Sequence, residues 1–181
     1  MDRAALRAVA LRVAALALLL ALTLVTVLGV RTLQQMPDAR IYLIRSEATS
    51  FRLEPVARRL GTRDAASYAV EAVRSLVDGP TAAEHRDGLS SEVPAGTVVR
   101  SAVLHDDGTL EVDLSASVAE GGGSASMRGR LEQLRWTLAR PASVRAVALR
   151  VEGERLFLLG GEGLIVEPSW SPPEHGRTPA W

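Results

Sequence analysis

The 181-residue chain contains no cysteine and no lysine, and each absence excludes particular kinds of chemistry. Without cysteine there is no thiol nucleophile, no thiolate metal ligand and no disulfide, and we expect no lipid anchor on an N-terminal cysteine. Without lysine there is neither the phosphate-binding lysine of a P-loop nor a lysine that forms a Schiff base with a substrate. Only 4% of the residues are aromatic, so the core is predicted to consist mainly of leucine, valine and alanine.

An excess of positive charge is also missing. The 21 acidic residues balance the 21 arginines, and residues 31–181 hold 18 basic and 20 acidic residues, because residues 1–30 contain three arginines and one aspartate. Nucleic-acid-binding domains are usually strongly basic, so we expect no nucleic-acid partner. The three histidines, His85, His105 and His175, have no second ligand at metal-binding spacing. We therefore expect no metal ion and no cofactor.

The longest apolar run lies near the N-terminus. Val13 to Val30 has 18 residues without charge or proline, which reaches the length of a membrane span. Three arginines precede it, so the positive-inside rule predicts residues 1–12 in the cytoplasm and the rest of the chain outside the bacterial cytoplasmic membrane. We expect residues 13–30 to be an uncleaved, single-pass signal anchor. The alternative is a cleaved signal peptide, whose apolar segment has a similar composition.

The remainder of the chain is predicted to be a linker, one domain and a tail. Residues 31–40 form the linker, residues 41–168 the domain, and residues 169–181, with three prolines, a disordered tail that carries Trp170 and Trp181. Apolar runs and period-two alternation predict strands in the domain at residues 41–44, 51–60, 97–104, 110–115, 144–151 and 155–159.

Helix signals separate these strands into pairs. Asp64 is a good N-cap for a helix that Gly79 and Pro80 end, and Thr81 to Glu84 reads as a capping box. The resulting order is β-β-α-β-β-α-β-β, with a last apolar piece at residues 164–166. Helices that alternate with hairpins favour an α+β fold, in which the helices cover one face of a mainly antiparallel or mixed sheet. One transmembrane helix is expected to precede this fold.

The stretch from Leu110 to Leu138 joins a strand, a glycine run and the second helix. Leu110, Val112 and Leu114 alternate with polar residues, as in a strand with one buried face. Gly121 to Gly123 follow, and Ser124 is predicted to be the N-cap of the helix. Four apolar residues then form one stripe at helical spacing: Met127, Leu131, Leu134 and Leu138.

Several short motifs in this stretch and around it occur in a characteristic order. They are VDLS at 112–115, GGSAS at 122–126 and LxQLxxTL at 131–138, with LxxGPT at 76–81, GL at 88–89, VPxGT at 93–97 and VxxVxL at 144–149. Together, over about residues 41–166, the chain resembles the GerMN domain of bacterial sporulation and spore-germination proteins. The resemblance implies a small α+β module that packs against copies of itself or against partners, and it implies no enzymatic activity and no catalytic residues.

The glycine run is the best candidate for a ligand site. Free N–H groups at the start of a helix can bind a carboxylate, a phosphate or a sugar acid, here helped by Arg128 and Arg130. The candidate residues are Gly121, Gly122, Gly123, Ser124, Ser126 and Arg128. The alternative is a structural hinge in which glycine supplies positive φ angles. The arginines of this helix, at positions 128, 130, 135 and 140, are otherwise expected to form a solvated face.

A pair of carboxylates offers a different chemistry. Glu111 and Asp113 point to the same face of one strand, with Cα atoms roughly 6.5 Å apart, a separation that does not exclude a glycosidase pair. The alternative is the solvated face of a half-buried strand.

The function that these features favour is non-enzymatic. We expect a membrane-tethered, extracytoplasmic module that acts in cell-envelope assembly or in sporulation or germination by binding a protein partner, peptidoglycan or copies of itself. A cell-wall hydrolase that uses Glu111 and Asp113 is one alternative. A sensor that holds an anion or a small ligand at Gly121 to Ser126 is another.

Overall fold

The computed structural model describes residues 39–47, 50–62, 64–160 and 163–172, and five isolated helical residues near the N-terminus: Leu18, Leu19, Ala21, Thr23 and Val25. The rest of the predicted anchor, together with residues 1–12 and 31–38, lies outside the described residues. Among those described, no helix is long and apolar enough to span a membrane. The chain divides into two compact units, Met1–Met36 and Pro37–Trp181, and the second contains the fold.

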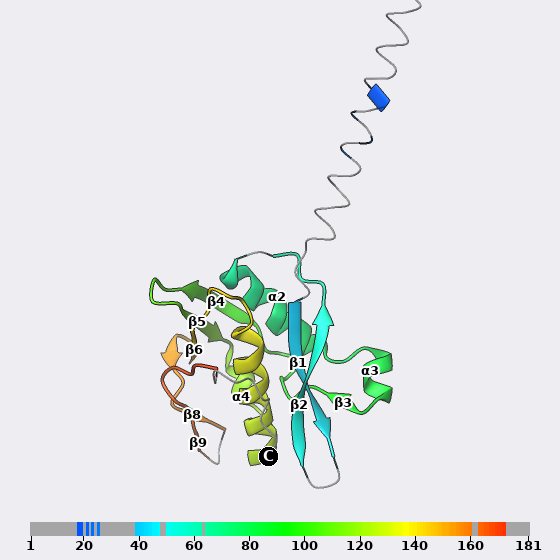
Figure 1. Ribbon diagram of the computed structural model, residues 1–181. Coiled ribbons are helices and arrows are strands. Elements are labelled where there is room, and N and C mark those ends of the chain that lie inside the picture. The colour runs from blue at the N-terminus through cyan, green and yellow to red at the C-terminus, as the bar shows by residue number, and fades with distance from the viewer. Residues whose placement is uncertain are drawn as a thin grey trace, which may run out of the picture. The chain divides into compact units, whose positions relative to one another are not determined.

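A three-stranded antiparallel sheet forms one side of this unit (Figure 1). Strand β1 (Ala39–Ser46) is central, between β2 (Phe51–Arg58) and the short β3 (Leu89–Ser90). Both faces of β1 are buried, because Ile41 and Leu43 belong to the main core whereas Tyr42 and Ile44 belong to a second apolar cluster. The dense apolar run that predicted this strand reflects that double burial.

A four-stranded mixed sheet forms the other side. Its order is β4-β5-β6-β7, with β4 (Val99–Leu104), β5 (Thr109–Leu114), β6 (Ala146–Val151) and β7 (Glu154–Arg155). Strands β4 and β5 are an antiparallel hairpin, whereas β5 and β6 are parallel. A parallel pair needs a long crossover, and the chain between β5 and β6 contains the second long helix. A separate small hairpin consists of β8 (Leu158–Leu159) and β9 (Leu164–Ile165).

The helices begin and end close to the residues that the sequence indicates. Helix α2 (Ala65–Asp78) begins after Asp64, whose carboxylate accepts the Ser67 N–H, and ends at Gly79 with φ of 76°. The short α3 (Ala82–Arg86) begins with the predicted capping box of Thr81 and Glu84. A 3₁₀ turn, η1 (Ala116–Ala119), and helix α4 (Ser124–Leu138) follow β5.

Helix α4 packs against β1 and β2 of the three-stranded sheet and also contacts α2 and β9 (Figure 1). Its predicted apolar stripe is buried in the main core, which also contains residues of both sheets and of α2. The α+β class with antiparallel and mixed strands is therefore confirmed, but the strands do not form the single sheet that was expected. Because α4 is covered on more than one side, its arginines also differ from the expectation, and Arg130 and Arg135 are only 3% and 7% exposed.

The start of the predicted disordered tail is ordered. The backbone of Trp170 forms an antiparallel bridge with Val147 of β6, with N–H to O distances of 2.8 and 2.9 Å. Its ring packs on Trp136 at a centroid distance of 5.6 Å, and Trp136 packs on Tyr42 at 5.7 Å. Trp170 thus packs against the second apolar cluster, a contact that the proline content of the tail did not predict.

Candidate functional site at the start of the central helix

The glycine run enters α4 through two residues with positive φ. Gly121 and Gly122 have φ angles of 63° and 80°, a region that other residues rarely adopt. Gly123 is extended and is the N-cap, so Ser124 is the first helical residue rather than the predicted cap. Glycine has no side chain to accept a hydrogen bond, and α4 accordingly begins without a side-chain cap.

Gly122 is also needed for packing. A Cβ atom at this position would lie 2.5 Å from Ser126 Oγ and 2.8 Å from Ser126 Cβ. Ser126 cannot easily move away, because its hydroxyl donates to the Glu92 carboxylate at 2.5 Å. Ser126, one of the predicted ligand residues, is therefore already bound to a neighbouring loop of the protein.

The Arg130 side chain is hydrogen-bonded to backbone carbonyls in and around the glycine run. Its Nη1 donates to the carbonyls of Val118 and Glu120 at 2.6 and 2.9 Å, its Nη2 to that of Gly121 at 3.3 Å, and its Nε to that of Glu92 at 2.8 Å. Burial lowers the pKa of Arg130, and the nearby Glu92 opposes that shift. The guanidinium is thus a buried clamp on backbone carbonyls, which corrects the expectation that it would help to bind a ligand at the surface.

The polar residues later in α4 complete the hydrogen bonds of β1. Strand β3 pairs only with Ile44 and Arg45, so the backbone of Tyr42 has no strand partner on that side. Thr137 Oγ1 accepts the Tyr42 N–H at 3.0 Å, and Gln133 Nε2 donates to the Tyr42 carbonyl at 3.0 Å. The Tyr68 hydroxyl donates to the Thr137 carbonyl at 3.1 Å, and burial raises the pKa of this phenol.

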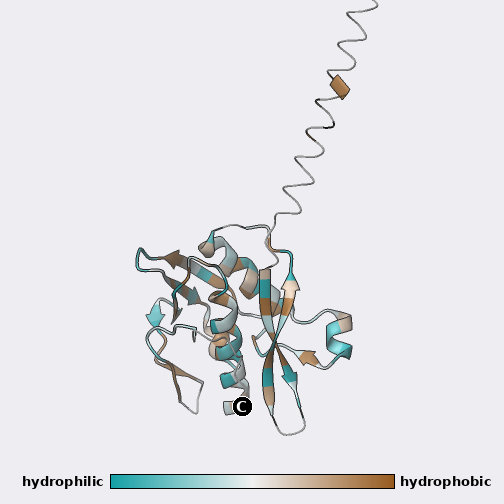
Figure 2. Cartoon of the chain, in the orientation of Figure 1, coloured by the Kyte–Doolittle hydropathy of each residue, from teal (hydrophilic) through white to brown (hydrophobic). Residues whose placement is uncertain are grey.

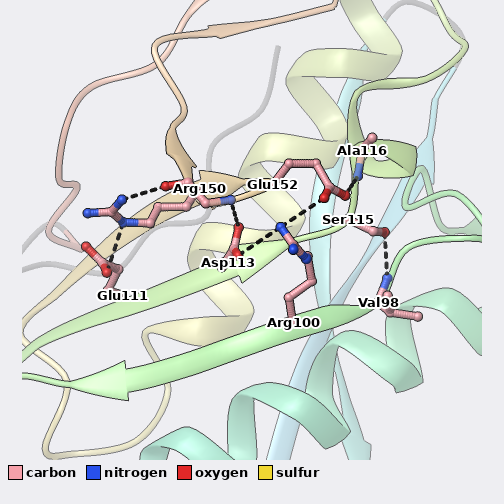
Figure 3. A network of polar contacts seen from close by, with 9 residues as sticks. Val98, Arg100, Glu111, Asp113, Ser115, Ala116, Arg150 and Glu152 are labelled. Carbon is pink, nitrogen blue, oxygen red and sulfur yellow. Dashed lines mark hydrogen bonds and ion pairs between the residues drawn. The ribbon is translucent and has the colours of Figure 1, made fainter.

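The remaining motif residues also bind one another. Ser115 Oγ accepts the Val98 N–H at 3.1 Å (Figure 3). It also donates to the Gly96 carbonyl at 3.2 Å, which connects VDLS to VPxGT. A Cβ atom on Gly96 would lie 3.0 Å from Ser117 Oγ, so this loop approaches η1 closely. Polar residues of VDLS, GGSAS and LxQLxxTL therefore bind groups within the domain.

A hollow of about 570 Å³ lies beside the start of α4. Its walls come from the glycine run, from α4 and from the β8–β9 hairpin: Gly122, Gly123, Ser124, Met127, Leu159, Gly163, Leu164 and Ile165. Of the predicted ligand residues, Gly122, Gly123 and Ser124 line this hollow, whereas Ser126 faces Glu92. Arg128 is exposed on the first turns of α4.

The β8–β9 hairpin makes this surface apolar. Phe157, Leu158 and Ile165 are 55%, 59% and 78% exposed, so three large apolar side chains project into solvent near the hollow. Clustered exposed apolar residues commonly mark a contact with another molecule. The sequence signal was the apolar run Leu156 to Leu159, which predicted a strand at residues 155–159 without indicating that it would be exposed.

The carboxylates of β5 are held by arginines. Glu111 and Asp113 do point to one face, as predicted, but Arg150 Nε lies 2.9 Å from Glu111 Oε1 (Figure 3). Asp113 accepts the Gly153 N–H at 2.9 Å and lies 3.4 Å from Arg100 Nη1. Both groups therefore have structural partners, and Asp113 is 8% exposed. Across the described ranges, no three potential ligand side chains gather as they would around a metal ion.

Comparisons with known proteins identify this combination of fold and motifs. The Germane family model, described as sporulation and spore germination, matches residues 40–157. The fold is similar to that of the tandem GerMN domains of the sporulation protein GerM from Bacillus subtilis, at 22% identity and a TM-score of 0.61, over 74% of this chain and 45% of that one. It is also similar to the first GerMN domain of GerM, at 24% identity and a TM-score of 0.57, over 74% and 96%. The chain thus spans less than half of the tandem structure, and comparison with curated proteins finds no match.

Proposed function

The chain belongs to the GerMN family of sporulation and spore-germination domains, and from this premise we propose that it is a non-enzymatic binding module. In this proposal its domain is tethered to the bacterial cytoplasmic membrane and faces outward. It takes part in envelope assembly, or in a process of the sporulation or germination type, by contacting a protein partner.

The observation that carries this proposal is the use of the motif side chains. Ser115, Ser126, Arg130 and Gln133 all bind groups within the domain, so the motifs build a scaffold instead of a reactive centre. What the same region exposes is an apolar hairpin beside a hollow. Exposed apolar patches commonly mark contacts between proteins, so this surface favours a protein partner over a polysaccharide such as peptidoglycan.

The tether is proposed from composition. Residues 13–30 are long and apolar enough to span a bilayer, and three arginines precede them. Protease treatment of intact spheroplasts should degrade the domain only if it faces outward. The mass of the membrane-extracted protein should equal that of the full chain if the anchor is retained. Protection from protease, or recovery in the cytosol, would contradict this part of the proposal.

Crosslinking tests whether the hollow is used. The full chain is crosslinked in its membranes and purified, and the recovered proteins are compared with those from Ile165→Asp and Ala142→Asp. Both variants add the same charge at an exposed position, but only the first lies at the hollow. We expect one protein to be enriched with the wild type and Ala142→Asp and lost with Ile165→Asp. If the full chain binds only to purified peptidoglycan, the partner is this polymer instead.

A further inference from the structure

The free edges of the two larger sheets differ in how they are protected. Edge strand β2 carries Pro55 and the charged residues Arg52 and Glu54, and β7 is only two residues long, both charged. Proline, charge and shortness are the devices by which proteins prevent another chain from pairing with an edge. These two edges are therefore closed to strand addition.

The β4 edge carries Arg100 and a bulge between Val99 and Ser101, but its last four residues have none of these devices. Ser101 to Leu104 contains neither proline nor charge, and Figure 2 shows this end of the strand as hydrophobic. The His105 N–H donates to Thr109 at 2.9 Å, and hydrogen-bonded pairs alternate along an antiparallel hairpin. The backbone groups of Ala102 and Leu104 consequently point away from β5, and no strand of the described fold pairs with them.

A groove of about 290 Å³ lies next to the start of this edge. Helix α2 forms one wall, and the segment that leads into β4 forms the other. The lining residues are Val70, Val73, Arg74, Val77, Asp78, Ala95, Thr97, Val98 and Val99. Val70 and Val98 are 47% and 57% exposed, although both are valines. An extended chain along β4 could place small apolar side chains between these two residues.

Thr97 adds a polar group to this apolar groove. Its side chain is 3% exposed, and its hydroxyl has no hydrogen-bond partner within the described fold. A buried hydroxyl without a partner is unfavourable, and most such groups in proteins are paired. A peptide backbone supplies both donors and acceptors, so a bound strand could provide the missing partner after a small shift of the groove walls.

We propose that the β4 edge and the α2 groove together bind an extended segment of a partner protein, which adds as a further strand with small apolar residues facing α2. This mode of recognition combines backbone hydrogen bonds with side-chain pockets. The inference rests on the proposed function: the same partner contacts the β8–β9 hairpin with one surface and the β4 edge with an extended segment, and a short peptide represents that segment alone. A second copy of the chain fits less well, because edge-to-edge pairing would bring its own α2, roughly 10 Å in diameter, toward the same groove.

The test uses the full chain in lipid nanodiscs and a phage-displayed library of random decapeptides. Selected peptides are synthesised, and their binding is measured by fluorescence anisotropy. We expect them to carry alanine or valine at alternate positions. Val70→Glu should weaken binding at least tenfold, whereas Ile165→Glu, which adds the same charge at the β8–β9 hairpin, should leave it unchanged. Thr97→Val should weaken binding severalfold without lowering the thermal midpoint.

Amide hydrogen exchange supplies the readout of strand addition. Bound peptide should slow exchange at Ala102 and Leu104 and leave that at Ser101 and Val103, which already face β5, little changed. Failure to select any peptide that Val70→Glu rejects would overturn the inference, and so would unchanged exchange at Ala102. A chain that dimerises through this edge would overturn it as well. If the crosslinked partner is still recovered with Val70→Glu, the inference fails while the proposed function stands.

Discussion

Arginines play opposite parts at the start of α4 and on the outer face of the four-stranded sheet. Arg130 is 3% exposed and donates to four backbone carbonyls, from Glu92, Val118, Glu120 and Gly121. Arg100 and Arg150 have side chains that are 42% and 35% exposed, and they pair with carboxylates. The first arginine is surrounded by protein, whereas the other two remain in contact with water.

This difference indicates where the stability of the fold lies. A buried guanidinium that satisfies carbonyls cannot be removed without leaving several buried acceptors unpaired. Exposed ion pairs are weakened by water and salt, so most of them contribute little. The polar network of the family motifs should therefore be sensitive to substitution, and the charged outer face should tolerate it.

The largest effect is expected at the clamp itself. Replacing Arg130 with methionine keeps much of the volume but leaves the Val118 and Glu92 carbonyls without donors, and it should lower the free energy of unfolding by about 3 kcal/mol. Urea unfolding of the full chain measures this value. Arg128→Met, two residues earlier at an exposed position, should change it by less than about 1 kcal/mol. Equal losses in the free energy of unfolding at both positions would contradict the expectation that the buried arginine contributes more.

The glycine run provides the next test. Gly122→Ala forces a Cβ atom against Ser126 at a φ angle of 80°, so we expect a loss of about 2 to 3 kcal/mol. Gly123→Ala is the matched control, because its φ angle is −99° and no atom lies within 4 Å of the added Cβ. It should cost less than about 1 kcal/mol in the same unfolding measurement, the loss expected from alanine at an N-cap. A tolerated Gly122→Ala would mean that the loop rearranges freely.

A half-buried ion pair should have an intermediate effect. Arg58 donates two hydrogen bonds of 2.7 Å to Glu84. These bonds are the main reason why the pKa of the Glu84 carboxyl falls from its ordinary 4.5 to about 2. Because the folded pKa is the lower one, the stabilisation is present above pH 4.5 and is lost as the pH falls toward 2. We expect it to amount to about 1 to 2 kcal/mol. Unfolding followed across this range should show a smaller pH dependence for Glu84→Gln than for the wild type.

The outer face should give the smallest effect. Glu111→Gln removes the pair with Arg150, whose two side chains are 27% and 35% exposed, and should cost only about 0.5 kcal/mol. A double-mutant cycle with Arg150→Met measures the coupling between the two residues. The same variant tests the hydrolase alternative in a cell-wall lysis assay. Lysis by the wild type that disappears in Glu111→Gln would contradict the non-enzymatic proposal.

Local signals predicted several elements well. The cap at Asp64, the stop at Gly79 and the capping box at Thr81 are all present, because each depends on atoms within four residues of the chain. The apolar stripe of α4 and the buried face of β5 are likewise correct. The one-residue error at Ser124 has a local cause as well, since Gly123 adopts an extended conformation that begins the helix without a side-chain cap.

Surfaces were harder to predict than elements. The sequence predicts one strand at residues 155–159, but the structure has two short strands there, and Phe157 and Leu158 are exposed because β8 pairs only with β9. The α2 groove could not be predicted either, because its walls are some twenty residues apart in sequence. Apolar periodicity indicates which residues seek burial, but it does not indicate whether a neighbouring element is available to cover them.

By itself, the sequence determined the family, the α+β class and the positions of the main helices, because caps, glycine φ angles and periodicity act over a few neighbouring residues. Only the tertiary structure decided which polar residues are buried. Arg130 becomes a clamp because it donates hydrogen bonds to carbonyls 12 and 38 residues away in the chain. Gln133 likewise donates to the carbonyl of Tyr42, 91 residues away. Such contacts arise when packing excludes water from groups that the chain alone leaves far apart, so no local pattern records them.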